Sequence, residues 1–179
     1  MTNRSVLGRS LFGLVVVLAA VSLHAAEEPA VLEKRLETAS GAEKVDVLLQ
    51  LAEAHTLRAP DKAVRYAQEA YGAAQTLALA KPAARALLLR ASGQYHLGDL
   101  DRALQSYEEG LVAAKALPDD LLVGGCLNGV AIVRMKRGDL AAALPAFDEA
   151  MVYLERSGNK ERPAAVTSNV SLIYYSRGE

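Results

Sequence analysis

Two histidines and two pairs of neighbouring carboxylates are the residues of this 179-residue sequence best suited by type to proton-transfer chemistry. His55 and His96 are the histidines beyond the first 26 residues, and Glu108-Glu109 recurs as Asp148-Glu149 after 40 residues. A general acid or base must lie within hydrogen-bond reach of its substrate. Neither histidine has a serine or cysteine partner in a recognisable motif, and the carboxylates follow a period that runs through the sequence. We interpret the carboxylates as a solvated helix face and the histidines as packing residues, and we expect no enzyme within these residues.

Cys126 is the single cysteine, so an internal disulfide and a thiolate zinc cluster are excluded. We expect it to be a small buried hydrophobe. No spacing of His, Cys and carboxylates matches a metal motif, and no strand pattern precedes a glycine-rich phosphate loop. We therefore expect no metal and no cofactor.

The composition favours close-packed helices, because Ala and Leu dominate and only 5% of residues are aromatic. The formal net charge is −1, from 20 Lys+Arg and 21 Asp+Glu. Without residues 1–26, which contribute Arg4 and Arg9, 18 basic residues face 21 acidic ones, a net charge of −3. No basic excess is available to hold a phosphate backbone, which argues against nucleic acid as a partner.

Residues 1–26 have the pattern of a secretory signal peptide. Arg4 and Arg9 precede an apolar run over 11–21, and Ala25-Ala26 comes directly before Glu27-Glu28. We expect export to the periplasm or cell envelope of a bacterium. An uncleaved N-terminal anchor is the alternative, although the run is shorter than the about 20 apolar residues of a relaxed membrane span. No later segment is apolar enough to cross a bilayer.

The rest of the sequence repeats with a period of 40 residues. Gly98-Asp99-Leu100 recurs as Gly138-Asp139-Leu140, and Gly178-Glu179 begins a third copy. Each unit is predicted to form two amphipathic helices joined by a turn. The Gly of the turn is expected to adopt the left-handed conformation, and the Asp to cap the second helix. The expected helices span 84–97, 100–117, 124–137, 140–157 and 164–177. Tyr107 and Phe147 should fill the space beside small residues at positions 91, 103, 131 and 143.

These positions resemble the tetratricopeptide repeat from about residue 43 onward. The matching residues are Ala91, Gly98, Ala103, Tyr107 and Gly110, which recur as Ala131, Gly138, Ala143, Phe147 and Ala150. The resemblance implies an all-α, right-handed α-solenoid of antiparallel helix pairs. The usual unit has about 34 residues, and we expect linkers such as 117–120 and 157–160 to absorb the excess of the 40-residue unit.

The expected organisation is a signal peptide (1–26), a lead-in helix region (27–42) and a repeat domain (43–179). The repeats span about 43–80, 84–117, 124–157 and a half repeat, 164–179. Ser40 and Glu43 match a capping box, and Pro60 suits a helix start. Pro145 predicts either a kink or a later start of its helix, because proline inside a helix costs about 3 kcal/mol.

The half repeat leaves an apolar helix without its own second helix. Solenoids normally end in a helix with a polar outer side. We expect the chain to be the leading part of a longer protein; the alternative is that another molecule covers this face.

The resemblance also implies a binding surface, because the first helix of each tetratricopeptide hairpin lines the concave face that holds protein partners. The alternative is that many of these side chains only pack between helices. The Lys/Asn set that grips C-terminal carboxylates in some family members is not reproduced. Mapped onto this sequence, the concave face carries Leu48, Ala52, His55, Arg85, Leu88, Ser92, Tyr95, His96, Asn128, Ile132, Met135, Lys136, Ser168, Leu172, Tyr175 and Ser176.

The 40-residue spacing and the leader resemble the N-terminal repeat regions of bacterial sensor histidine kinases and diguanylate cyclases. This resemblance implies an exported protein–protein interaction module that forms the input part of a larger signalling protein. A free-standing envelope scaffold or assembly factor is the alternative. In both cases the expected partner is a protein or peptide.

Overall fold

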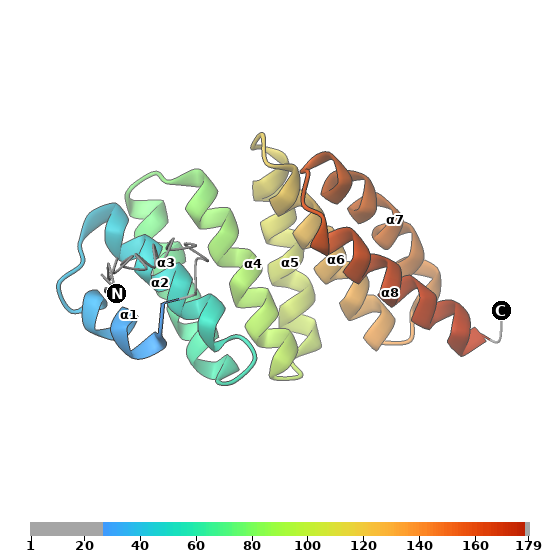
Figure 1. Cartoon of the computed structure of the whole chain (residues 1–179), viewed down its shortest axis with the longest axis horizontal. Helices are drawn as coiled ribbons and strands as arrows, with labels where there is room; N and C mark the ends of the chain where they lie inside the picture. Colours follow the sequence, from blue (N-terminus) through green and yellow to red (C-terminus); the bar gives the residue numbers. More distant parts are fainter. Residues whose placement is uncertain (1–26, 178–179) are drawn as a thin grey trace, which may run out of the picture.

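The computed structural model describes residues 27–177 as eight helices joined by turns of three or four residues, with no strand in this range. Figure 1 shows the helices following one another along the long axis of the molecule, from α1 to α7 and α8. Their bounds are α1 Pro29–Leu36, α2 Gly41–His55, α3 Pro60–Thr76, α4 Ala80–His96, α5 Leu100–Lys115, α6 Asp120–Lys136, α7 Leu140–Arg156 and α8 Glu161–Arg177. The expected signal peptide (1–26) and the Gly178-Glu179 copy of the repeat lie outside the described residues.

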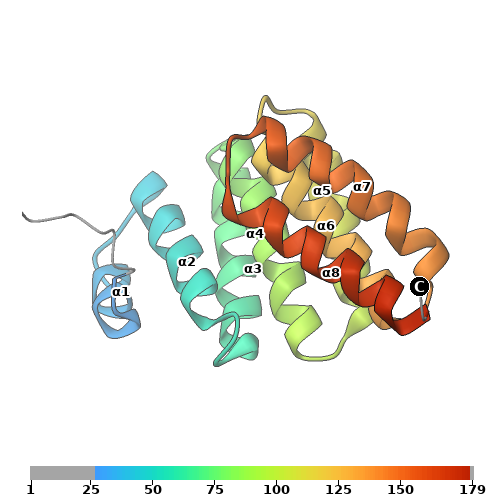
Figure 2. The same ribbon diagram turned by 45° about the vertical axis from the view of Figure 1, so that its right-hand side comes forward.

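Consecutive helices pack as pairs, and the pairs stack into an α-solenoid. Helix α2 packs on α3, α4 on α5 and α6 on α7, while the first helices also touch one another in the order α2, α4, α6 and α8. In Figure 2, α8 crosses in front of α6 and beside α7, where it contacts both. The expectation of an all-α repeat fold is confirmed. No helix between residues 27 and 177 has the length and apolar character that crossing a bilayer demands.

Long helices, rather than long linkers, account for the 40-residue period. Helices α4 and α6 begin at Ala80 and Asp120, four residues before the expected positions 84 and 124. Each of these helices has 17 residues, whereas the linkers 116–119 and 157–160 have only four. Pro82 does not prevent the early start of α4, because it lies in the first helical turn, where its missing N–H would have no partner.

The Gly-Asp turns form as the sequence predicts. Gly98 and Gly138 have φ angles of 81° and 82°, in the left-handed region. The Asp99 side chain accepts a hydrogen bond from the Arg102 backbone N–H at 3.2 Å, and Asp139 accepts one from Ala142 at 3.1 Å. Each second helix therefore has one of its free N–H groups satisfied by a carboxylate.

The capping box expected at Ser40 does not form. Helix α2 does begin directly after Ser40, but the Ser40 side chain makes no capping hydrogen bond. The Glu43 carboxylate instead lies 3.7 Å from the Arg35 guanidinium of α1. Pro60, by contrast, begins α3 as expected.

Helix α7 begins at Leu140 and runs through Pro145, so of the two alternatives expected there, a kink or a later helix start, the later start is wrong. Pro145 is the sixth residue of the helix and is exposed. Its cost of about 3 kcal/mol is outweighed by the burial of the same helix, in which Phe147 and Leu154 are almost completely buried. Burying side chains of this size contributes about 1.5–3 kcal/mol each.

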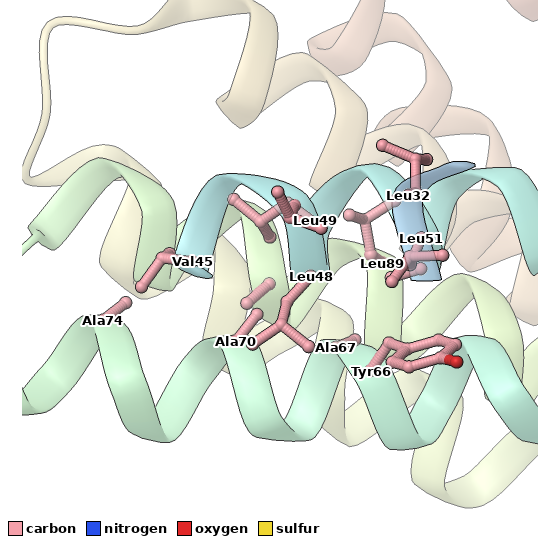
Figure 3. Packing of buried hydrophobic residues seen from close by; sticks show 13 residues of the cluster. Leu32, Val45, Leu48, Leu49, Leu51, Tyr66, Ala67, Ala70, Ala74 and Leu89 are labelled. Atoms are coloured by element: carbon pink, nitrogen blue, oxygen red, sulfur yellow. The ribbon is translucent and has the colours of Figure 1, made fainter. Parts of the chain in front are cut away.

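The core consists of small clusters between successive helices rather than one central mass. Figure 3 shows the N-terminal cluster, in which Leu32 of α1 and Leu48 and Leu51 of α2 pack near Tyr66 and Ala67 of α3. Further along the chain, the rings of Tyr107 and Phe147 are buried beside Ala91, Ala103, Ala131 and Ala143, which all have no exposed area. The expected packing of aromatic rings beside small residues is confirmed.

Candidate functional site

The first helices line a hollow of about 530 Å³, which we call the inner groove. Helices α2, α4, α6 and α8 all contribute to it, because the solenoid brings first helices together on one side. Tyr107 of α5 also reaches it. The lining residues are Glu53, Thr56, Leu57, Leu88, Leu89, Ser92, Tyr95, His96, Tyr107, Gly125, Asn128, Gly129, Ile132, Met135, Arg162 and Asn169.

Two adjoining hollows extend the inner groove in opposite directions. One, of about 410 Å³, shares Tyr95 and Met135 with it; the other, of about 300 Å³, shares Glu53, Leu88, Leu89 and Arg162. We call the first the apolar end, lined by Tyr95, Met135, Lys136, Leu140, Leu172 and Ile173. We call the second the charged end, lined by Glu53, Lys81, Arg85, Leu88, Leu89, Asp119, Leu121, Leu122 and Arg162.

The charged end contains one more cation than it has carboxylates. Arg85 pairs with Glu53, and Lys81 pairs with Asp119, each at 2.6 Å. Arg162, the third cation, forms no ion pair with any carboxylate among residues 27–177. Its guanidinium is therefore available to an anion from outside.

Asp119 both caps the start of α6 and forms an ion pair with Lys81. Partial burial alone would raise the pKa of the Asp119 carboxyl, but hydrogen bonds from Lys81 and from the backbone N–H of Leu122 hold that pKa below its usual value. The backbone bond is 2.9 Å long. Asp119 is therefore charged at neutral pH and is occupied by partners within the chain.

Tyr107 forms part of the groove floor and is held as a neutral phenol. Burial raises the pKa of Tyr107 to about 12. Its hydroxyl lies 3.0 Å from the Ser92 hydroxyl, within hydrogen-bond distance. The floor is thus a fixed apolar ring with one satisfied polar tip.

Glycines of α6 leave space for the side chains that approach the groove. A methyl group placed on Gly125 would come within 2.9 Å of Leu88 and 3.2 Å of the Arg162 guanidinium. The absence of that methyl group allows Arg162 to lie against α6. Asn128 follows one helical turn later, and its Oδ1 is buried without a hydrogen-bond donor among the described residues.

Most of the residues predicted for the concave face lie along the groove. The predicted residues in the inner groove itself are Leu88, Ser92, Tyr95, His96, Asn128, Ile132 and Met135. Arg85 lies at the charged end, and Lys136 and Leu172 lie at the apolar end. The structure therefore brings together residues of α4, α6 and α8 that are up to 87 positions apart in sequence, from Arg85 to Leu172.

The remaining predicted residues lie elsewhere. Leu48 and Ala52 are fully buried core residues, because α2 presents them to neighbouring helices rather than to the groove. His55 stacks on Tyr66 at 5.8 Å, and its Nε2 lies 3.8 Å from a Glu33 carboxylate oxygen of α1.

Two further predicted residues are exposed outside the three hollows, namely Ser168 and Tyr175. The side chain of Ser176 lies outside the described part of the structure. The groove is therefore lined by only part of the residues that were predicted for the concave face.

Sequence reasoning missed Arg162, because it expected the last helix to begin only at residue 164, two positions after Arg162. In the structure, the Asn159 side chain accepts a hydrogen bond from the Arg162 backbone N–H at 2.9 Å, and α8 begins at Glu161. The available signal was Asn159 itself, a favourable N-terminal capping residue. Glu53 was missed because its only distinguishing feature, the pair with Arg85, joins two different helices.

A larger hollow of about 780 Å³ lies among α3, α4 and α5, away from the inner groove, and several of its polar groups bond to one another. Arg90 donates to Ser106 at 3.1 Å, to Gln68 at 2.9 Å and to Glu109 at 2.6 Å. The Ser106 hydroxyl in turn donates to Gln94 at 2.7 Å. This cluster ties three helices together and gives Arg90 three partners within the chain.

The residues first considered for chemistry are dispersed. Glu108, Glu109, Asp148 and Glu149 are exposed on α5 and α7. Burial raises the pKa of the Cys126 thiol to about 12, so it is a protonated core residue. Within residues 27–177, no three His, Cys or carboxylate residues form a group that could hold a metal ion.

Comparison with known proteins identifies the fold. No protein-family model matches the sequence, and no curated protein sequence matches it. A Rap protein complexed with competence and sporulation factor superposes with a TM-score of 0.77 at 18% identity, over 86% of this chain and 43% of that one. Aspartyl phosphate phosphatase F from Bacillus subtilis gives 0.64 at 16% identity, over 82% and 44%. BtubC from P. vanneervenii gives 0.65 at 23% identity, over 86% and 63%.

These structural similarities show that the fold of this chain is a helical-repeat, tetratricopeptide-like α-solenoid. The chain spans less than half the length of the Rap protein and of the phosphatase, and about 63% of BtubC.

Proposed function

We propose that this chain is a protein–protein interaction module whose inner groove binds a segment of a protein or a peptide. The observation that carries the proposal is the continuity of three hollows along the first helices, from Lys81 and Arg85 at one end to Leu172 at the other. A surface that combines aromatic, aliphatic and arginine side chains is typical of protein interfaces.

The structural neighbours support this proposal. The Rap protein is complexed with competence and sporulation factor, so an α-solenoid of this type holds a ligand in at least one case. The polar hollow around Arg90 is a weaker candidate, because its central groups, on Arg90, Ser106, Gln94 and Glu109, already have partners within the chain.

Peptide selection tests the groove directly. Random peptides of about a dozen residues, displayed on phage, are selected on the folded wild-type chain, and the affinities of enriched peptides are measured by fluorescence anisotropy. Ile132→Asp in the inner groove should weaken these peptides by at least about tenfold, because it places a charge in a half-buried apolar contact.

The matched control is Gln105→Ala in the polar hollow of α3, α4 and α5, which should leave the affinities unchanged. Circular dichroism checks that both variants retain their helix content. Enriched peptides that bind Ile132→Asp as tightly as wild type, or a selection that enriches none, would refute the proposal.

We further propose that residues 1–26 direct export to the bacterial periplasm or envelope, where the repeat domain is the input part of a larger signalling protein. The composition of the leader and the 40-residue period support this proposal. Residues 1–40 fused to alkaline phosphatase, which is active only outside the cytoplasm, should yield active enzyme. A fusion that is inactive and remains in the cytoplasm would contradict export.

A further inference from the structure

Arg162 and the apolar end together restrict what the inner groove can bind. Resting on the proposed function, we propose that the groove takes an extended protein segment that carries Asp or Glu four or five positions from a large apolar residue. The carboxylate binds Arg162, and the apolar side chain enters the apolar end. The proposal therefore specifies both the chemistry and the spacing of the ligand.

The charge balance of the groove favours an acidic residue over a basic one. Both carboxylates at the charged end already have cationic partners at 2.6 Å, while Arg162 has none among residues 27–177. A guanidinium pairs with a carboxylate through two parallel hydrogen bonds, which fixes orientation as well as charge. A basic ligand residue at this position would meet Arg162 without a free carboxylate to compensate it.

Two helices give the same distance between Arg162 and the apolar end. On α6, Gly125 lies against Arg162 and Met135 lines the apolar end, ten residues further on. On α8, Arg162 itself and Leu172 are also ten residues apart. With a rise of about 1.5 Å per helical residue, both separations are about 15 Å. An extended chain advances about 3.3–3.6 Å per residue, so four or five residues cover this distance.

The middle of the groove suits an extended chain rather than a helix. Asn128 and Asn169 face it from α6 and α8, and Asn128 Oδ1 has no hydrogen-bond donor within the described residues. An extended segment carries unpaired backbone N–H and C=O groups, which an asparagine amide can satisfy after rotation of its side chain. A helix satisfies these groups internally and would leave the amides without partners.

A charge reversal at Arg162 tests the inference. The displayed-peptide selection is repeated on the full chain carrying Arg162→Glu and on a control, Lys160→Glu, which makes the same change of charge two residues away and outside the groove lining. Wild type and Lys160→Glu should both enrich Asp or Glu four or five positions from Leu, Ile, Met, Phe or Tyr. Arg162→Glu should enrich Lys or Arg at the acidic position instead.

Affinity measurements add a second readout. Arg162→Gln should weaken the wild-type peptides by about fivefold, the effect expected for a partly exposed ion pair. Lys160→Gln should not weaken them.

The outcomes separate this inference from the proposed function. If Ile132→Asp abolishes binding but Arg162→Glu enriches the same acidic peptides as wild type, the groove binds peptides and the inference is wrong. Enrichment of a spacing near ten residues would indicate a helical ligand and also overturn it. A selection that enriches no peptide refutes the inference and the proposed function together.

Discussion

Gly129 of α6 lies directly against the ring of Tyr107, whereas Gly72 of α3 faces open space. A methyl group added at Gly129 would stand 2.5 Å from the Cδ1 and Cζ atoms of that ring, well inside van der Waals contact. At Gly72, no atom lies within 4 Å of the same added group. The two glycines therefore provide a matched pair for testing how closely α5 and α6 are packed.

The two substitutions should change stability in opposite directions. Gly→Ala inside a helix gains about 1 kcal/mol in helix propensity, so Gly72→Ala should raise the free energy of unfolding by about that amount. Gly129→Ala gains the same helix propensity, but its methyl group must displace the buried Tyr107 ring, at a cost of about 1–3 kcal/mol. Tyr107 cannot easily move away, because it is 7% exposed and is bound to Ser92. We place the cost near the upper end, which gives a net loss of about 1–2 kcal/mol.

Urea unfolding followed by far-UV circular dichroism measures both effects. The midpoint should rise for Gly72→Ala and fall for Gly129→Ala, and the slope of each transition should match that of wild type. In thermal unfolding, each kcal/mol should shift the midpoint by about 2–4 °C. A Gly129→Ala variant at least as stable as Gly72→Ala would show that α5 and α6 do not approach each other this closely at Tyr107.

Three further predictions concern the core, a cap and the thiol. Phe147→Ala should lower the free energy of unfolding by about 3–5 kcal/mol, because its ring is fully buried; a loss below about 1 kcal/mol in urea unfolding would contradict this packing. Asp119→Ala should cost about 1 kcal/mol by removing the cap on Leu122. Since the pKa of Asp119 is lowered on folding, its stabilisation should be complete above about pH 5 and should disappear as pH falls through the unfolded and then the folded pKa. A stability difference between wild type and Asp119→Asn that stays constant through that acid range would be inconsistent with this assignment. Cys126 should react with thiol reagents only as the protein unfolds, because burial keeps it protonated with a pKa of about 12; rapid labelling of the native chain would exclude this.

The expectations for the Gly-Asp turns and for the buried rings, which follow from the repeat, are confirmed. The turn at Gly98-Asp99 and its copy 40 residues later form because a left-handed glycine and a capping carboxylate act within about four residues. The burial of Tyr107 and Phe147 follows equally from their place in the repeat. Such features recur wherever the same residues recur, so the period alone predicts them.

The tertiary structure decided features that depend on how separate helices approach one another. The cap at Ser40 does not form and Glu43 lies near Arg35 of α1, and the core residue Leu48 faces other helices rather than the groove. Arg162 comes against Gly125 although 37 residues separate them, because α8 stacks beside α6. A repeat specifies which side of each helix is apolar. Only the stacking of helices decides which side chains meet across the groove, because the distance between facing helices is set by the packing of side chains far apart in sequence.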